Sequence, residues 1–286
     1  RGWSFLDGRF DEFVELLPAQ QRIEATWYQG TADAVYQNLD ILRRHDPQYV
    51  LILAGDHVYK MDYGRMLEDH VDARAQMTIA CIDVPLADAR SLGVMAVDGN
   101  GRILEFREKP AQPAPMPDRA DRALASMGIY VFRPEVLREV LVGSPYTDFG
   151  KEVIPASLGR IRVFAFPYDG YWTDIGTIPS FHQANLDLTV PLPALNLYNP
   201  NYPIYTHARF LPGTKINGCS VTRSVLCEGS IITGAKISDS IVGIRAIVQT
   251  GTTIERSIIM GANRFEPLAE ASSHAVKTGI GRDCAI

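Results

Sequence analysis

The stretch Tyr49-Val50-Leu51-Ile52-Leu53-Ala54-Gly55-Asp56-His57 decides the fold class of this 286-residue chain. Its apolar run is too short to span a membrane and is typical of a buried strand in a parallel sheet. Ligands of open α/β sheets gather at the carboxyl ends of such strands. Asp56, which follows Gly55, therefore places a carboxylate where it can hold a metal beside a phosphate. A turn in which Asp56 caps the next segment is the alternative.

Helical and strand patterns alternate on both sides of this strand, up to about residue 188. Helical spacing after Thr31, a plausible N-cap, runs through Val35, Leu39 and Leu42. The other elements that we expect are helices at 61–73 and 134–142, strands at 77–82 and 127–132, and a hairpin of 94–97 with 102–106. The inner side of the first of these helices should carry Met66, Leu67, His70 and Val71. This alternation predicts an α/β domain over residues 1–188 with a mixed, mostly parallel sheet.

The pattern changes in the second half of the chain. Residues 189–205 contain four prolines without periodicity, which indicates a stiff linker. Beyond it, apolar residues recur in steps of five or six, at Leu226, Ile232, Ile237, Val242, Val248, Ile254 and Ile259. Such steps are typical of hexapeptide repeats, in which each coil of a parallel β-helix takes about 16–18 residues. We therefore expect an incomplete β-helix over residues 206–286.

Composition narrows the class of protein. The net charge of −5 comes without a basic block, which argues against nucleic acid as a partner. Cysteines occur without C-x-x-C spacing, which predicts reduced thiols in a cytosolic protein, at Cys81, Cys219, Cys227 and Cys284. No run is long enough for a membrane helix and no signal peptide is visible. The chain lacks an initiating Met and stops within a repeat, so we expect that both ends are cut.

A first candidate site lies in the segment Trp27-Tyr28-Gln29-Gly30-Thr31-Ala32-Asp33-Ala34. Gly30 permits close backbone approach, and the helix that follows would offer free N–H groups to an anion. Tyr28 could stack on a ligand or hydrogen-bond to it. The alternative is a plain capped helix with a Tyr in the core.

A second candidate is the strand end Glu105-Phe106-Arg107-Glu108-Lys109-Pro110. On a strand, Phe106 and Glu108 share one face while Lys109 points to the other. Lys109 can neutralise a phosphate there, although a solvated salt-bridged strand end is the commoner fate of such a pair. Ser126, at the start of another strand, is a weaker candidate for a sugar contact because hydroxyls there usually cap turns.

A third candidate is Tyr171-Trp172-Thr173-Asp174-Ile175-Gly176-Thr177. Asp174 could be the second ligand of a Mg²⁺ ion whose first ligand is Asp56, since Mg²⁺ is commonly held by one or two carboxylates plus substrate phosphates. The alternative is that Asp174 is the N-cap of a helix that begins at Ile178. Asp148, which opens the string Asp148-Phe149-Gly150-Lys151, reads mainly as an N-cap.

Several strings together resemble one family, ADP-glucose pyrophosphorylase (glucose-1-phosphate adenylyltransferase). They are W-Y-Q-G-T-A-D-A-V, L-A-G-D-H-V-Y-K-M-D-Y, S-L-G-V-M, F-R-E-K-P, A-S-M-G-I-Y-V-F, D-F-G-K-E-V-I-P and Y-W-T-D-I-G-T, in the family's order. The segment P-I-Y-T-H-A-R-F-L-P-G-T-K-I and the repeats resemble its C-terminal domain. The resemblance implies a Rossmann-like nucleotidyltransferase domain, then a left-handed parallel β-helix, and synthesis of ADP-glucose for glycogen or starch.

The same resemblance implies residue roles. Asp56 and Asp174 would hold Mg²⁺, and Lys109 would bind the phosphate of glucose 1-phosphate. The remaining residues would contact the substrates: Glu108, Gly93 and Ser126 the sugar, Tyr28 the substrate site, and Gly30 and Thr31 the nucleotide. The family also implies ATP as co-substrate, small-molecule allosteric effectors, a homotetramer and a location in the bacterial cytoplasm.

One departure from the family is clear. Its Gly-rich loop of the form G-G-x-G-x-R-L-x-P-L-T, which wraps the triphosphate, is not in this chain. We therefore expect a piece of a longer enzyme that is inactive or poorly stable alone. Three alternatives stay open: a sugar-1-phosphate nucleotidyltransferase that uses UTP, dTTP or GTP, a non-catalytic regulatory subunit of a heteromeric enzyme, and a β-helix acyltransferase. The last would need a catalytic His, and His274 is the only one past His207.

Overall fold

The chain forms two compact units in a computed structural model that describes residues 14–17, 27–204, 209–265 and 279–286. Among these described residues, one unit, here called the sheet unit, lies within Glu15–Gly55 and Lys60–Gly170; the other, the β-helix unit, lies within Asp56–Tyr59 and Tyr171–Ile286. The expected domain limits at 188 and 189 remain predictions. The expected end of the linker at 205 and start of the β-helix at 206 lie outside the described residues, as do His207 and His274.

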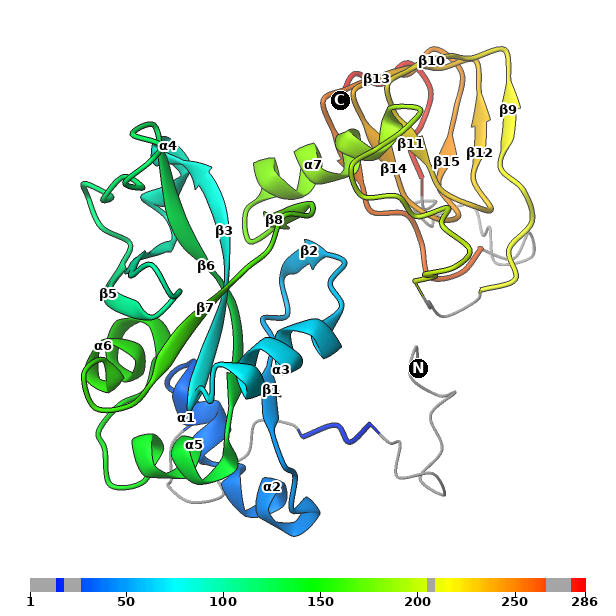
Figure 1. The fold of residues 1–286 in the computed structure, drawn as a ribbon. Coiled ribbons are helices and arrows are strands. Elements are labelled where there is room, and N and C mark those ends of the chain that lie inside the picture. The colour runs from blue at the N-terminus through cyan, green and yellow to red at the C-terminus, as the bar shows by residue number, and fades with distance from the viewer. Residues whose placement is uncertain (1–13, 18–26, 205–208, 266–278) are drawn as a thin grey trace. The chain divides into compact units, whose positions relative to one another are not determined.

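The sheet unit is built on a six-stranded sheet (Figure 1). Its strands are β1 Val50–Ile52, β3 Met77–Pro85, β4 Gly93–Val97, β5 Ile103–Glu108, β6 Arg122–Phe132 and β7 Val163–Pro167. The order is β5-β4-β6-β3-β7, and β1 also pairs with β6. The predicted hairpin is confirmed as the pair β4–β5.

The sheet is mixed, as predicted, but the expectation of mostly parallel pairing is wrong. Only β3 and β7 pair in parallel within the described sheet. The other pairings, β1–β6, β3–β6, β4–β5 and β4–β6, are antiparallel. The reason is the position of β6, which runs against β1, β3 and β4 and separates strands that share one direction. Alternation of helices and strands along the chain determines neither the order of the strands in the sheet nor their direction.

Helices cover both faces of this sheet. They are α1 Thr31–Tyr36, α2 Leu39–His45, α3 Tyr63–Asp72, α4 Leu86–Ala89, α5 Pro134–Leu141 and α6 Ile154–Ser157, with a π-helical turn at Phe149–Val153. Met77, Ile79 and Cys81 point into the core shared with α5 and α6, whereas Thr78, between them, hydrogen-bonds to His70 of α3. Burial on both faces explains the continuous apolar run of β3.

Two local expectations about helices need correction. The helix expected from Thr31 to Leu42 is two helices, because the Asn38 side chain donates to the Ala34 carbonyl oxygen at 2.8 Å and Asn38 becomes the N-cap residue of α2. On α3, Met66 and His70 are buried as expected, but Val71 is 44% exposed.

The β-helix unit contains three parallel three-stranded sheets (Figure 1). They are formed by β9 Lys215–Asn217, β12 Ile231–Thr233 and β15 Ile247–Val248; by β10 Ser220–Thr222, β13 Lys236–Ser238 and β16 Thr253–Glu255; and by β11 Val225–Leu226, β14 Ile241–Val242 and β17 Ile258–Ile259. Ile232 pairs with Val248 and Ile237 with Ile254, so one coil takes the predicted number of residues. All seven apolar residues that revealed the repeat lie in or against its core.

The corners of the coils use left-handed backbone in stacked columns. One column consists of Gly218, Gly234 and Gly251, and another of Arg223, Asp239 and Arg256, all with positive φ. Arg223 Nη1 also lies 3.3 Å from Asp239 Oδ1, an ion pair between adjacent coils. The helix α7 Ile178–Leu186 contacts this stack, since His182 Nε2 lies 2.7 Å from the Asp239 carbonyl oxygen.

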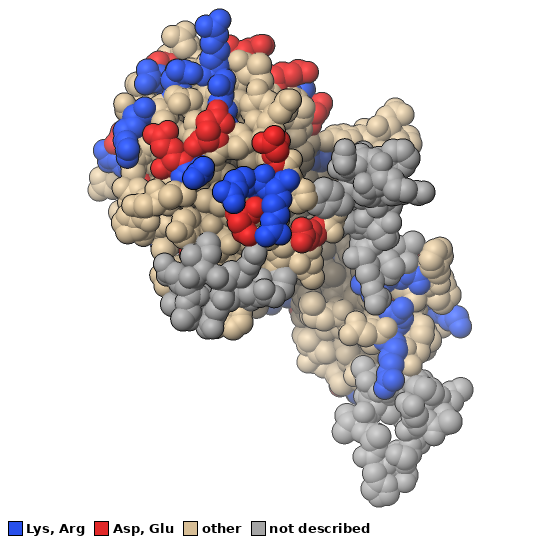
Figure 2. Space-filling model, turned by 90° about the horizontal axis from the view of Figure 1, so that it is seen from below, with Lys and Arg blue, Asp and Glu red and all other residues tan. Residues whose placement is uncertain are grey.

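The structure describes the surface charges and the four cysteine thiols. Figure 2 shows acidic and basic side chains interspersed over the upper part of the face that it presents. No helix in the described part of the chain has the length and apolarity needed to cross a membrane. All four cysteines are free, and Cys81 is buried with its thiol 3.4 Å from the Phe166 carbonyl oxygen.

Candidate active site

Asp56 and Asp174 lie together in the β-helix unit. They flank a two-stranded antiparallel sheet of β2 His57–Tyr59 and β8 Trp172–Asp174, in which His57 pairs with Asp174. The Ile175 amide donates to the Asp56 carbonyl oxygen at 3.0 Å, which closes this end of the ladder. A Cβ atom added to Gly176 would lie 3.0 Å from Asp174 Oδ1 and 3.5 Å from Asp56 Oδ2. The two carboxylates therefore approach the same point, beside a residue without a side chain.

Neither carboxylate serves as a helix cap. Helix α7 is capped by Thr177, in a reciprocal capping box with Ser180. The Asp174 carboxylate instead accepts from the Gly176 amide at 2.7 Å, so the alternative interpretation as N-cap of α7 is wrong. The side chain of Asp56 is 64% exposed, with His57 Nε2 3.7 Å from Oδ1. Both carboxylates thus keep oxygen atoms available to a ligand.

The donor set of this pair fits a divalent metal that completes its shell with substrate. No group of three or more His, Cys, Asp or Glu side chains able to hold a metal ion occurs among the described residues. Mg²⁺, however, is usually bound by one or two carboxylates together with phosphates and water. Two convergent, partly exposed carboxylates meet that requirement, whereas a structural zinc site would need four protein ligands.

Glu108 is enclosed by two glycines in the sheet unit. A Cβ atom at Gly93 would lie 2.9 Å from Glu108 Oε2 and 2.4 Å from Phe106 Cζ, and one at Gly150 would lie 2.6 Å from Glu108 Oε2. Burial raises the pKa of Glu108, while nearby Lys109 lowers that pKa and Asp148 raises it. The glycines are thus required by the close approach of the carboxylate, which they hold at the carboxyl end of β5.

Lys109 does not follow the strand geometry that the sequence predicted. Strand β5 ends at Glu108, and Lys109 has left-handed backbone with φ of 47°. Its amide donates to the Leu92 carbonyl oxygen at 3.0 Å. Left-handed backbone in a residue other than glycine costs on the order of 1 kcal/mol and is enriched at functional sites. A turn, not the alternation of the strand, therefore directs this exposed lysine.

Ser126 lies at an irregularity of β6. The β3–β6 register shifts between Ile79 and Cys81, opposite the stretch that contains Gly128 with φ of 67°. Ser126 is buried and its hydroxyl accepts from the Gly128 amide at 3.2 Å. Burial raises the pKa of Tyr130 to about 12, a side-chain hydrogen bond with Ser126 opposes the rise, and Glu108 adds to it. Bulges of this kind often lie next to active sites, where they redirect side chains.

The segment around Gly30 is used differently from our expectation. The Tyr28 hydroxyl accepts from Asn38 Nδ2 at 2.9 Å. Two first-turn amides of α1, those of Ala32 and Asp33, both donate to the Thr147 carbonyl oxygen, at 2.8 and 3.1 Å. No side chain caps α1, and the Thr31 hydroxyl accepts from the distant Phe149 amide at 3.2 Å. The expected free N–H groups at this helix end are therefore largely occupied by protein.

The candidate residues thus form separate groups within the units. Asp56 and Asp174 belong to the β-helix unit; the sheet unit holds Tyr28, Gly30, Thr31, Gly93, Glu108, Lys109 and Ser126. Sequence reasoning missed the surroundings of Glu108, to which Asp148 and Gly150 contribute. The D-F-G-K string was the available signal, but Asp148 was interpreted mainly as a cap, and the family resemblance assigned no role to this string. That cap is confirmed, since Asp148 Oδ1 accepts from the Lys151 amide at 2.9 Å.

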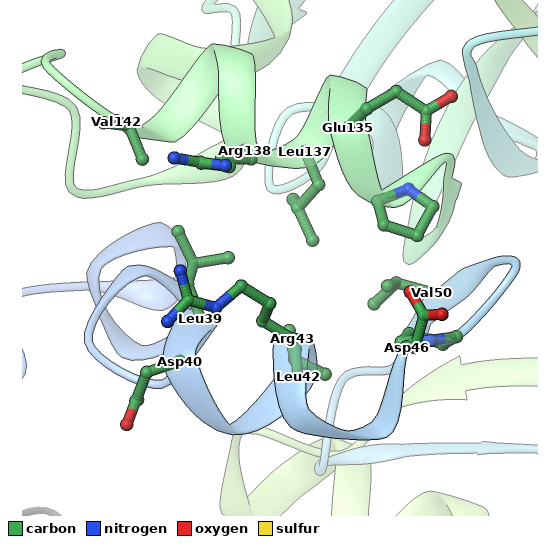
Figure 3. Close-up of a pocket in the computed structure, with 12 residues that line it drawn as sticks. Leu39, Asp40, Leu42, Arg43, Asp46, Val50, Glu135, Leu137, Arg138 and Val142 are labelled. Carbon is green, nitrogen blue, oxygen red and sulfur yellow. The ribbon is translucent and has the colours of Figure 1, made fainter.

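Two hollows of the sheet unit contain none of these candidates. A cavity of about 320 Å³ lies between α2 and α5. Figure 3 shows Leu39, Leu42 and Leu137 among the side chains that line it, with Arg43 and Arg138 near one end. A larger hollow of about 960 Å³ is lined by residues that include Lys60, Arg65, Asp83, Arg119 and Arg122. Arg119 and Arg122 both form ion pairs with Asp83, so the charge of this carboxylate is already neutralised.

Comparison with known families covers both halves of the chain. Residues 4–190 match the family model described as nucleotidyl transferase. Residues 209–286 match the model described as the GLGC left-handed parallel beta-helix domain. These matches confirm the predicted nucleotidyltransferase fold and assign the left hand to the coils described above.

Curated bacterial relatives carry one name. The chain is 48% identical to glucose-1-phosphate adenylyltransferase 2 of Alkalilimnicola ehrlichii over 93% of this chain and 67% of the relative. It is 45% identical to the glucose-1-phosphate adenylyltransferase of Dechloromonas aromatica (100% and 69%) and 50% identical to that of Nitrosococcus oceani (91% and 66%). The chain thus spans about two thirds of the length of these relatives. It belongs to the glucose-1-phosphate adenylyltransferase family of nucleotidyl transferases.

Proposed function

We propose that the protein transfers the adenylyl group of ATP to α-D-glucose 1-phosphate, with ADP-glucose and pyrophosphate as products. The observation that carries the proposal is the approach of Asp56 and Asp174 to one point beside Gly176, in a chain of this family. Enzymes of the family generally use a divalent metal. We propose Mg²⁺ at this carboxylate pair, because the pair leaves room for phosphate oxygens as further ligands.

The reaction is an in-line displacement at phosphorus. A phosphate oxygen of glucose 1-phosphate forms a bond to the α-phosphorus of ATP. The bond from that phosphorus to the oxygen that bridges to the β-phosphate breaks, and pyrophosphate leaves. Such chemistry requires little beyond positioning and charge neutralisation. Bound Mg²⁺ would supply part of that neutralisation, and the protein side chains supply the rest.

The roles follow from chemistry and motif. Lys109 presents an exposed ammonium group that neutralises the phosphate of glucose 1-phosphate. Glu108 and Ser126 offer oxygen atoms to sugar hydroxyls, and Gly93 keeps the surface beside Glu108 free of a side chain. Tyr28 lines the substrate site, and Gly30 with Thr31 lies near the nucleotide. These assignments rest on the matching motifs.

The test uses the whole natural protein that contains these residues. ATP, UTP, dTTP and GTP are each supplied with glucose 1-phosphate and Mg²⁺, and nucleotide sugar is measured by chromatography. We expect ADP-glucose to dominate; preference for another nucleotide would overturn the choice of ATP. Asp56→Asn should reduce turnover by about 100-fold or more, because a metal ligand loses its charge. Asp72→Asn, at an exposed position of α3, is the matched control.

The wider setting is also a proposal. We infer a homotetramer under control of small-molecule effectors, as family membership suggests, in the bacterial cytoplasm, where the four free thiols would stay reduced. Native mass of the natural protein tests the first inference, since a monomer or dimer at working concentration would contradict it. A screen of anionic metabolites for changes in turnover tests the second.

A further inference from the structure

The loop that leads into Asp148 is fastened to the start of α1. The Thr147 carbonyl oxygen accepts from the amides of both Ala32 and Asp33. A Cβ atom at Gly30 would lie 2.4 Å from the same oxygen, so only glycine permits this seating. In the other direction, the Phe149 amide donates to the Thr31 hydroxyl, across 118 positions of sequence. The two segments therefore hold each other through backbone groups.

The Glu152 side chain fixes this loop through hydrogen bonds. Its Oε2 accepts from the Thr147 amide at 2.7 Å, from the Asp148 amide at 3.0 Å and from the Thr147 hydroxyl at 3.2 Å. Hydrogen bonds from the backbone amides of Thr147 and Asp148 lower the pKa of Glu152, so the side chain is a carboxylate at neutral pH. One anionic oxygen thus fixes two consecutive peptide groups, and hydrogen bonds to charged acceptors are about twice as strong as neutral ones.

The same loop reaches the other candidate motif. Gly150 lies against Glu108, whose Oε2 would be 2.6 Å from a Cβ atom at that position. Asp148 is close enough to raise the pKa of Glu108. Residues 147–150 therefore bridge the segment of Tyr28, Gly30 and Thr31 and the end of β5.

We propose that Glu152 is a positioning residue for the reaction. It fixes residues 147–150 so that the segment around Gly30 and the segment around Glu108 and Lys109 keep a set spacing. This inference rests on the proposed function, because only there do the two segments serve different substrates. Glu152 itself touches neither substrate. A displacement of about 1 Å between reacting partners can cost on the order of 100-fold in rate.

The experiment compares Glu152→Ala, Glu152→Asp and Glu152→Gln in the whole natural protein. Ala removes the acceptor, Asp keeps the charge but shortens the reach, and Gln keeps one acceptor oxygen without the charge. We expect kcat/KM to fall by about 10- to 100-fold in the Ala variant, with the KM values for ATP and glucose 1-phosphate both raised. Gln should recover most of the loss and Asp little of it. Glu68→Gln, at an exposed position of α3, serves as control.

A second variant attacks the same contact from the other side. Gly30→Ala places a methyl group against the Thr147 oxygen and should resemble Glu152→Ala. If both act through one loop, the double variant should lose little more activity than either single variant. Fully additive losses, or a Glu152→Ala variant that keeps both KM values, would overturn the proposal. Failure of the unaltered protein to form ADP-glucose would instead count against the proposed function, so the two failures are distinguishable.

Discussion

The β-helix coils and the end of β5 use the same backbone conformation under opposite constraints. Arg256, at a corner of the coils, and Lys109, beside Glu108, both have φ of 47°. The corner belongs to a column in which Arg, Asp and Arg succeed one another, so the conformation recurs regardless of the side chain. Lys109 adopts it once, next to a glycine-enclosed carboxylate. Repetition specifies the first conformation, and a single set of long-range contacts specifies the second.

The largest effect should separate these two left-handed residues. Lys109→Gly removes the ammonium group and should lower kcat/KM for glucose 1-phosphate by about 100- to 1,000-fold. Arg256→Gly should leave kcat/KM unchanged. Both variants relieve the same backbone strain, so each should stabilise its own region by up to about 1 kcal/mol after the entropic cost of glycine. Steady-state kinetics and thermal unfolding of the two variants measure this contrast. Equal losses of kcat/KM in both variants would contradict a specific role of Lys109.

Removal of a core side chain tests how far repetition protects the coils. Ile237 is 2% exposed and stacks on Ile254 of the next coil. Ile237→Ala should destabilise the β-helix by about 2–5 kcal/mol, because a cavity remains where neighbours on both sides are fixed. Ile216→Ala, at a 49% exposed position of β9, is the control. Hydrogen exchange read by mass spectrometry should localise the loss to the coils; protection lost equally in β6 would contradict this expectation.

Addition of a methyl group tests the enclosure of Glu108. Gly93→Ala should cost about 1–3 kcal/mol of stability, since its Cβ would press on the Phe106 ring and the Glu108 carboxylate. It should also raise KM for glucose 1-phosphate more than KM for ATP. Gly99→Ala meets no atom within 4 Å and lies in the turn of the same hairpin, which makes it a matched control. A Gly93→Ala variant with unaltered kinetics would remove Gly93 from the site.

A further contrast between the two units concerns acid stability. His70 is buried, and burial together with nearby Arg133 lowers its pKa from 6.5 to about 4. Between pH 4 and 6.5 the imidazole of His70 binds a proton more readily in the unfolded chain than in the folded one. The stabilisation that the neutral, buried His70 provides is therefore complete above pH 6.5 and is lost as the pH falls towards 4. The loss should be on the order of 2–3 kcal/mol at about pH 4.5, because one pKa unit corresponds to about 1.4 kcal/mol. Thr78, whose hydroxyl lies 2.7 Å from His70 Nδ1, and the ring of Tyr49 are its other close neighbours.

The described coils contain no histidine between residues 209 and 265 or between 279 and 286. Hydrogen exchange at pH 4.5 and 7.5 should therefore show the sheet unit weakened by acid before the coils. His70→Gln should flatten the difference, whereas His45→Gln, at an exposed position, should not. A sheet unit whose protection does not change between these pH values would contradict the role of His70.

How much could be predicted from the sequence follows the same division. The seven apolar residues of the coils could be identified as core residues from the sequence, because equivalent positions recur from one coil to the next. The hairpin β4–β5 and helix α5 were equally local. The pairing of β6 with β1, β3 and β4 was not, because no periodicity encodes which strands become neighbours. Family motifs suggested that Asp56 and Asp174 meet, and the geometry beside Gly176 agrees with it.

The site was least predictable where distant backbone groups determine it. Strand alternation assigned a direction to Lys109, but the strand ends one residue earlier. The helix end at Gly30 was expected to be open, but Thr147 occupies it. The partners of the Thr147 carbonyl oxygen, the amides of Ala32 and Asp33, lie more than a hundred residues away in the sequence. The partners of Glu152, Thr147 and Asp148, are close in sequence, but no motif assigned a role to that contact. Such contacts become visible only once the chain is folded.

The buried thiol of Cys81 makes the opening of the sheet unit measurable by chemical labelling. Burial raises the pKa of Cys81 to about 12, and its side chain is fully buried in the core on β3, the strand that lies between β6 and β7. The other three cysteines are partly exposed, so an alkylating reagent at neutral pH would modify them first. Any later reaction at Cys81 must wait until β3 separates from its neighbours. The labelling rate of Cys81 therefore reports how often the sheet opens locally in the folded protein, without any engineered probe.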